Sequence, residues 1–124
     1  MSAPALAKTK TTIFVSFTKY GLHCWPSCNI EKVNFLQHPH GHTFHFRLYF
    51  KVDELDRELE FFDVKDKIIS FIEHEFSSDE IPSHMVDFGA MSCEHIATLL
   101  LNAFNASKVE VSEDGLDGAI VERS

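Results

Sequence analysis

Between residues 43 and 52, apolar and other side chains alternate without interruption. One set of alternate positions is wholly apolar: Phe44, Phe46, Leu48, Phe50 and Val52. Because successive side chains of a β-strand point to opposite faces, this pattern predicts a strand with one buried face. Such a strand has to pack against a second layer, so we expect a sheet that other elements cover on one side.

Three further strands are predicted. Thr11–Thr18 is rich in β-branched and aromatic residues, which is typical of a strand. Two short strands are expected over Lys108–Ser112 and Ala119–Glu122, joined through the turn-forming pair Asp114-Gly115. The segment Gly21–His38 contains Gly, Pro, Ser and Asn and predicts a long loop, and loops of that length usually carry function.

Two helices are predicted from apolar residues at helical spacing. The first covers Asp63–Phe76, with Asp63 as its N-cap, and the second covers Cys93–Phe104, with Ser92 as its N-cap. The order along the chain is therefore strand, strand, helix, helix, strand, strand. It predicts an α+β protein whose four-stranded sheet is antiparallel and whose two helices lie between strands 2 and 3.

Length and composition narrow the class of protein. The 124 residues suit one domain, residues 1–124, of which residues 1–10 are expected to be a flexible tail. The net charge of −8 makes nucleic acid an unsuitable partner, and no apolar run is long enough to span a membrane. The three cysteines Cys24, Cys28 and Cys93 are an odd number and no signal peptide precedes them, so free thiols in the cytoplasm are expected.

A cluster of histidines is the strongest chemical signal. Four of the eight histidines lie in the segment HPHGHTFH, and His40 and His42 are two residues apart at the start of the alternating strand. Both imidazoles should therefore point to the same face and could bind one ion. His23, which follows the first strand, is the best third ligand. Three histidines with an open fourth position are typical of a catalytic zinc site.

Two other interpretations of this cluster remain open. The histidines could be core or surface residues that bind no metal. Alternatively, Cys24 and Cys28 could form a structural zinc site with His38 and His42. The spacing loosely matches a zinc finger, but the histidines lead into a strand rather than lying on a helix, which favours the catalytic site.

Six short segments carry a resemblance to a known family: FTKYGLH at 17–23, HGH at 40–42, DVK at 63–65, IEH at 72–74, MSCEHIA at 91–97 and VEVSE at 109–113. Together they resemble the 6-pyruvoyl-tetrahydropterin synthase family, which includes the 6-carboxy-tetrahydropterin synthases of queuosine and 7-deazaguanine biosynthesis. The resemblance runs from about Thr11 to Glu122 and implies the tunnelling fold, in which the sheets of several subunits join into a barrel. It also implies a homo-trimer or hexamer with its site between subunits.

The resemblance further implies an activity. The expected enzyme is a zinc-dependent lyase that converts 7,8-dihydroneopterin triphosphate to 6-carboxy-5,6,7,8-tetrahydropterin, with His23, His40 and His42 as the metal ligands. A 6-pyruvoyl-tetrahydropterin synthase, or a homologue that binds zinc or pterin without catalysis, is the alternative.

Further residues receive roles in substrate binding. Glu113 matches the glutamate that anchors the pterin ring, with Glu94 and Cys93 beside it. The strand pattern independently places the Glu113 carboxylate on the same face as Val109 and Val111, which is the buried one. The two N–H donors of a pterin ring would satisfy such a carboxylate.

The proton-transfer groups are less clearly matched. His74, tuned by Glu73, resembles the family's Asp-His pair, and His84 is a second candidate for the same role. Many members carry a cysteine shortly before His-Gly-His, but residues 33–37 contain none. Cys24 is therefore assigned as the catalytic cysteine, with Cys28 as its alternative.

Overall fold

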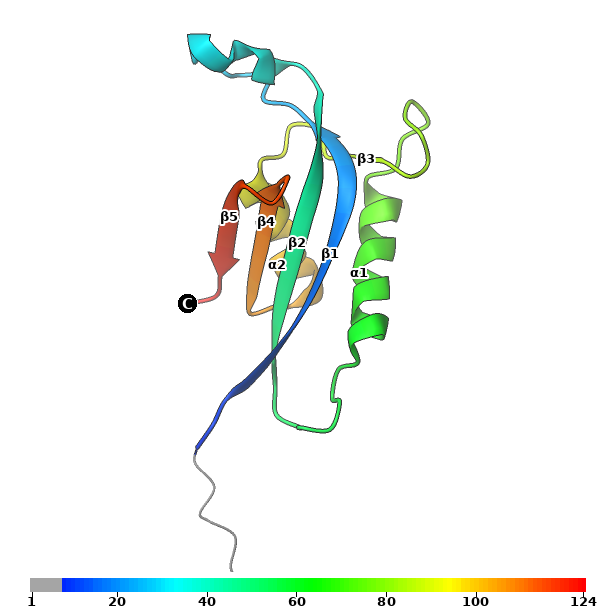
Figure 1. The fold of residues 1–124 in the computed structure, drawn as a ribbon, viewed down its shortest axis with the longest axis vertical. Coiled ribbons are helices and arrows are strands. Elements are labelled where there is room, and N and C mark those ends of the chain that lie inside the picture. The colour runs from blue at the N-terminus through cyan, green and yellow to red at the C-terminus, as the bar shows by residue number, and fades with distance from the viewer. Residues whose placement is uncertain (1–7) are drawn as a thin grey trace, which may run out of the picture.

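The computed structural model describes residues 8–124, so most of the tail predicted over residues 1–10 lies outside the described residues. None of the helices in the described range is long and apolar enough to cross a membrane. In chain order the elements are β1 (Thr11–His23), the 3-10 helix η1 (Glu31–Gln37), β2 (His40–Val52), α1 (Phe61–Glu75), β3 (Val86–Asp87), α2 (Cys93–Phe104), β4 (Lys108–Glu113) and β5 (Asp117–Glu122). The α+β class is confirmed (Figure 1).

The strands form one five-stranded sheet in the order β3-β1-β2-β4-β5. The pairs β1–β2, β2–β4 and β4–β5 are antiparallel, whereas β3 runs parallel to β1. The predicted sheet of four antiparallel strands is therefore wrong at this edge. β3 has only two residues, Val86 and Asp87, and so short a segment shows no alternation that a sequence could reveal.

β1 and β2 form a long hairpin, and the candidate site lies at the end where residues 24–39 connect the two strands. They pair along thirteen residues each, from Thr11 opposite Val52 to His23 opposite His40. The prediction ended the first strand at Thr18, five residues too early. The hydrogen bonds of β2 hold Lys19 to His23 in the sheet even though this stretch contains a glycine.

Both helices cover the same face of the sheet. Residues from β2, β4, α1 and α2 share one core, and the ring centroids of Phe71 in α1 and Phe104 in α2 lie 5.3 Å apart. Phe44, Phe46 and Leu48 are almost fully buried, as their alternation predicted, while His45 and Arg47 on the opposite face are exposed. The sheet thus has one covered face and one face that neither helix covers (Figure 1).

The ends of the helices differ from the prediction at α1, which runs from Phe61 to Glu75 rather than from Asp63 to Phe76. Ser92 caps α2 by accepting a hydrogen bond from the backbone N–H of His95. At α1 the N-cap is Glu60 rather than Asp63, because the Glu60 carboxylate accepts hydrogen bonds from the backbone N–H groups of Phe62 and Asp63. A long carboxylate can therefore perform the capping that is usually expected of a short polar side chain.

Candidate metal centre and its cavity

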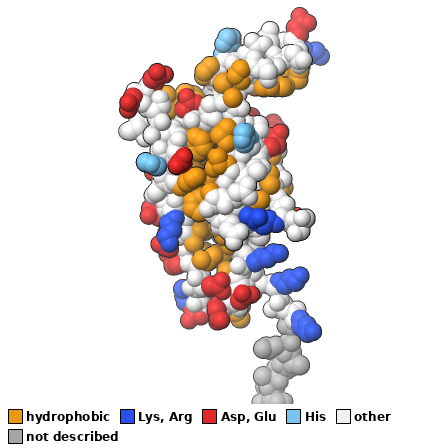
Figure 2. Space-filling model, turned by 180° about the vertical axis from the view of Figure 1, so that it is seen from behind, with side chains coloured by type: hydrophobic (Ala, Val, Ile, Leu, Met, Phe, Trp, Pro, Cys, Tyr) orange, Lys and Arg blue, Asp and Glu red, His pale blue; other side chains and the backbone are white. Residues whose placement is uncertain are grey.

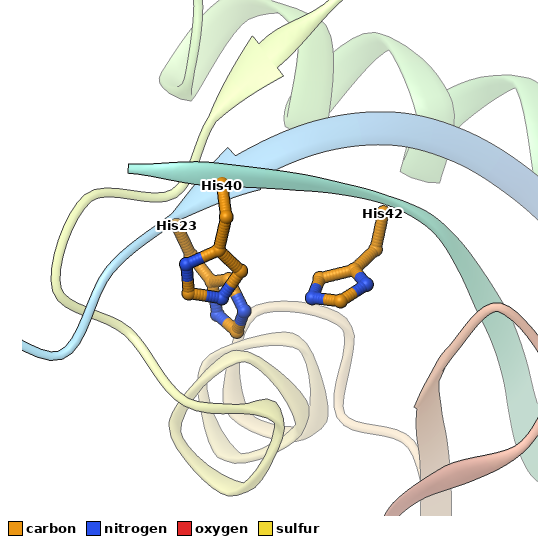
Figure 3. Close-up of side chains that lie close together, drawn as sticks. All are labelled: His23, His40 and His42. Carbon is orange, nitrogen blue, oxygen red and sulfur yellow. The ribbon is translucent and has the colours of Figure 1, made fainter. Parts of the chain in front are cut away.

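Three histidines converge at the end of the long hairpin. His40 and His42 are separated by one residue on β2 and therefore project from the same face, while His23 is the last residue of β1 and pairs with His40. Figure 3 shows the three rings pointing toward one another beneath β2. One nitrogen of each ring lies within 4.8 Å of the other two, so the group could hold a metal ion.

A second set of contacts fixes which nitrogen of each ring is free. The Nδ1 atoms lie 2.9 Å from the Met91 carbonyl in His23, 2.9 Å from the His38 carbonyl in His40, and 2.8 Å from an Asp114 carboxylate oxygen in His42. Carbonyl and carboxylate oxygens only accept, so each Nδ1 must donate its proton. In the neutral rings the lone pairs are therefore on Nε2, which is the arrangement seen in metal-ligating histidines.

The Nε2 atoms themselves provide a test of fit for a metal ion. Those of His23 and His42 are buried, and neither has a hydrogen-bond partner within the described chain. Burial of a polar atom without a partner is costly, and a bound cation would remove that cost. Burial is also the main reason that the pKa of His23 is lowered, which favours the neutral, ligating form of the ring. The residues present thus fit a metal ion.

Glu113 lies much closer to the histidines than its sequence position suggested. Its Oε2 is 3.1 Å from His23 Nε2 and its Oε1 is 3.5 Å from His42 Nε2. Its position follows from the sheet register, because Glu113 of β4 pairs with Phe44 of β2, two residues from His42. The Cys93 thiol donates to Oε2 at 3.9 Å. Burial above all, and then the charge of Glu113, raises the pKa of Cys93 to about 12, so the thiol stays protonated at neutral pH.

The histidines and Glu113 face a cavity of about 500 Å³. The predicted residues Cys24, Cys93 and Glu94 line it together with His23, His40 and Glu113. Two residues that the sequence did not point to, Trp25 and Leu36, also line it. They belong to the arm, residues 24–39, which connects β1 to β2. This arm projects from the body of the molecule, and hydrophobic side chains lie along its underside (Figure 2).

Other predicted site residues lie elsewhere in the described chain. Glu73 and His74 are near the end of α1 and do not line the cavity, and the Glu73 carboxylate accepts a hydrogen bond from Lys19 instead. His84 also lies outside it. Cys28 is buried within the arm, where its thiol faces the carbonyls of Ile30 and Val33.

The alternative zinc site of Cys24, Cys28, His38 and His42 is not assembled. Within residues 8–124, the three histidines of the hairpin form the one group of side chains that is placed to hold a metal ion.

Comparison with known proteins supports the fold. No protein-family model matches the sequence, and no curated protein matches it in a sequence search. Among solved structures, the chain is similar to an uncharacterized protein from Wolinella succinogenes, with a TM-score of 0.69 and 15% identity over 94% of this chain and 100% of the other. It is also similar to the Caenorhabditis elegans 6-pyruvoyl tetrahydropterin synthase, with a TM-score of 0.66 and 13% identity over 97% of this chain and 100% of that enzyme.

These observations define an α+β protein with a three-histidine centre at the connected end of a long hairpin. Its fold is that of a 6-pyruvoyl tetrahydropterin synthase. The resemblance found in the sequence is thus confirmed at the level of the fold.

Proposed function

We propose that this chain is a zinc-dependent lyase that converts 7,8-dihydroneopterin triphosphate to 6-carboxy-5,6,7,8-tetrahydropterin. The observation that carries the proposal is the convergence of three imidazoles, each with its Nδ1 bonded to an acceptor, at a cavity large enough for a bicyclic ring. Zinc suits this donor set because it is borderline-soft and commonly bound by three histidines in catalytic sites. The shared fold with a 6-pyruvoyl tetrahydropterin synthase supports the pterin as substrate class.

The cavity residues have separable roles in this proposal. His23, His40 and His42 hold the zinc, which when bound polarises oxygens of the substrate side chain and lowers their proton affinity. The carboxylates of Glu113 and Glu94 line the same cavity and can accept hydrogen bonds from the ring N–H groups. The Cys93 thiol, which stays protonated, donates to Glu113 and helps to orient it.

The residues proposed for proton transfer lie in two parts of the chain: Cys24 at the cavity, and Glu73 and His74 in α1. Cys24 lines the cavity as Cys93 does, but the Cys93 thiol stays protonated, so Cys24 is the cysteine that we assign to proton transfer. Leu36, which precedes His40, lines the same cavity and has no ionisable group. Glu73 and His74 lie outside the cavity of one chain, so we propose that they act at the cavity of a neighbouring subunit. A homo-trimer or hexamer would bring them there, and the end strand β5 offers an edge for such pairing.

Product analysis tests the activity. Zinc-loaded protein is incubated with 7,8-dihydroneopterin triphosphate, and the products are identified by mass, with a His40→Ala/His42→Ala double variant as the inactive control. We expect the carboxy-tetrahydropterin. A pyruvoyl product would establish the related synthase instead. Pterin binding without turnover would identify a non-catalytic homologue, which the absence of cysteine from residues 33–37 favours.

Ligand binding can be followed independently of turnover. Trp25 is the single tryptophan of the chain and lines the cavity. Its indole N–H donates to the Ser27 hydroxyl at 3.1 Å, and the ring is partly exposed, so a planar ligand in the cavity should change its fluorescence. A saturable change with biopterin that is accompanied by a heat of binding supports pterin binding. No change, together with no heat of binding, would contradict the substrate class.

A further inference from the structure

The two oxygens of the Glu113 carboxylate are spaced from two of the three histidines, His23 and His42, as one metal ligand is spaced from another. In a tetrahedral site with bonds of about 2.0–2.2 Å, neighbouring donor atoms lie roughly 3.3–3.6 Å apart. The carboxylate oxygens are 3.1 Å from His23 Nε2 and 3.5 Å from His42 Nε2. Both values are near the separation of two donors that share one ion.

The chemistry of these contacts also calls for a cation. The Nδ1 protons of His23 and His42 are already donated, to Met91 and Asp114, so in the neutral rings Nε2 carries a lone pair. An Nε2 lone pair and a carboxylate oxygen are both acceptors, and two acceptors repel at this distance. The 3.1 Å approach accordingly leaves His23 Nε2 without a hydrogen-bond partner. A positive ion between them turns the repulsion into two bonds.

We propose that Glu113 is the fourth ligand of the metal while no pterin is bound. This inference rests on the proposed metal centre and extends the role of Glu113 beyond that of a ring anchor. Oε2 is held in place by the Cys93 thiol, which supplies the outer hydrogen bond that ligating carboxylates commonly receive. Because the pterin ring would need the same carboxylate, a bound pterin would draw Glu113 away from the metal.

Zinc affinity of the pterin-free protein tests this assignment. Metal-depleted wild type, Glu113→Gln and Glu113→Asp are titrated with Zn²⁺ against a chromogenic chelator. Glutamine removes the charge, and aspartate keeps it but shortens the reach by one methylene. Asp117→Asn is the matched control. Asp117 lines the same cavity and pairs with Glu113 across the β4–β5 hairpin, so this substitution removes one negative charge close to Glu113. We expect both Glu113 variants to bind Zn²⁺ at least tenfold more weakly and Asp117→Asn to match wild type.

The outcomes separate this proposal from the proposed function. Equal affinity of wild type and both Glu113 variants, or an equal loss in Asp117→Asn, would overturn the ligand assignment and leave the three-histidine centre intact. Failure of wild type to bind Zn²⁺ would instead refute the metal centre. If Glu113→Gln does not fold, Glu113→Asp and the visible spectrum of Co²⁺-loaded wild type decide. That spectrum should change when biopterin is added, and an unchanged spectrum would refute the exchange of the carboxylate.

Discussion

Asp114→Asn should lower metal affinity although Asp114 is not proposed as a ligand. Its two carboxylate oxygens have separate partners: Oδ2 accepts from His42 Nδ1 at 2.8 Å and Oδ1 accepts from the Thr43 backbone N–H at 3.0 Å. The hydrogen bond from His42 is the main reason that the pKa of Asp114 is lowered. The residue has φ of 57°, a left-handed conformation that asparagine also tolerates, so the substitution should leave the backbone in place.

Asparagine cannot satisfy both donors. It has one acceptor oxygen, so its NH₂ group must face either the Thr43 N–H or the imidazole. The backbone donor cannot change, but the imidazole can move its proton to Nε2 and accept from the NH₂ group. That tautomer blocks the nitrogen that would bind the metal. Loss of such an outer partner typically lowers metal affinity about 10- to 100-fold, which is the size of effect expected here.

The measurement is a competition titration with Zn²⁺ and a chromogenic chelator at neutral pH. Asp117→Asn serves again as the control, because it carries the same change of charge in the same hairpin without touching His42 Nδ1. Thermal unfolding of the metal-free proteins should be nearly the same for wild type and Asp114→Asn, since the side chain is half exposed. Wild-type zinc affinity in Asp114→Asn would refute the argument that this contact selects the ligating tautomer.

Three other outcomes are expected. The purified protein should bind about one zinc per chain, and replacing both His40 and His42 by alanine should abolish this binding. Loss of zinc on replacing Cys24 and Cys28 by serine would instead favour a structural site. Light scattering at micromolar concentration should give a trimer or hexamer, and a clean monomer would contradict a site shared between subunits. At pH 8 a chromogenic disulfide should label Cys24 rapidly and Cys93 only after unfolding, because the Cys93 thiol is buried and its pKa is raised to about 12; rapid labelling of Cys93 in the folded protein would refute that environment.

The features that followed from local pattern were predictable. The alternation along β2 identified the buried face, and with it the common direction of His40 and His42. The cap at Ser92 and the turn at Asp114-Gly115 rest on the chemistry of one or two residues, and both are present. In each case the information lies within a few positions of the chain, where side-chain periodicity and backbone preference act directly.

The features that depend on partners distant in the sequence were not predictable. β3 forms because Val86 is buried beside Gly21 of β1. A strand of two residues has no alternation from which the sequence could predict it. β1 reaches His23 because β2 continues to pair with it. Glu73 and His74 were matched to the family's Asp-His pair by resemblance, but neither lines the cavity of its own chain, and the Glu73 carboxylate accepts a hydrogen bond from Lys19, 54 positions away in the chain.

At the β4–β5 turn, two adjacent residues contact different nitrogens of the same imidazole ring, that of His42. Glu113 ends β4 with its carboxylate 3.5 Å from His42 Nε2, whereas Asp114, next in the chain, bonds to Nδ1 of the same ring. Adjacent side chains of a straight strand would point to opposite faces of the sheet. The positive φ angles of Asp114 and Gly115 turn the chain instead, so that the second carboxylate reaches the same imidazole. The backbone of this turn therefore sets both the tautomer of His42 and the surroundings of the nitrogen that faces the metal, which makes the hairpin as much a part of the proposed centre as the three histidines.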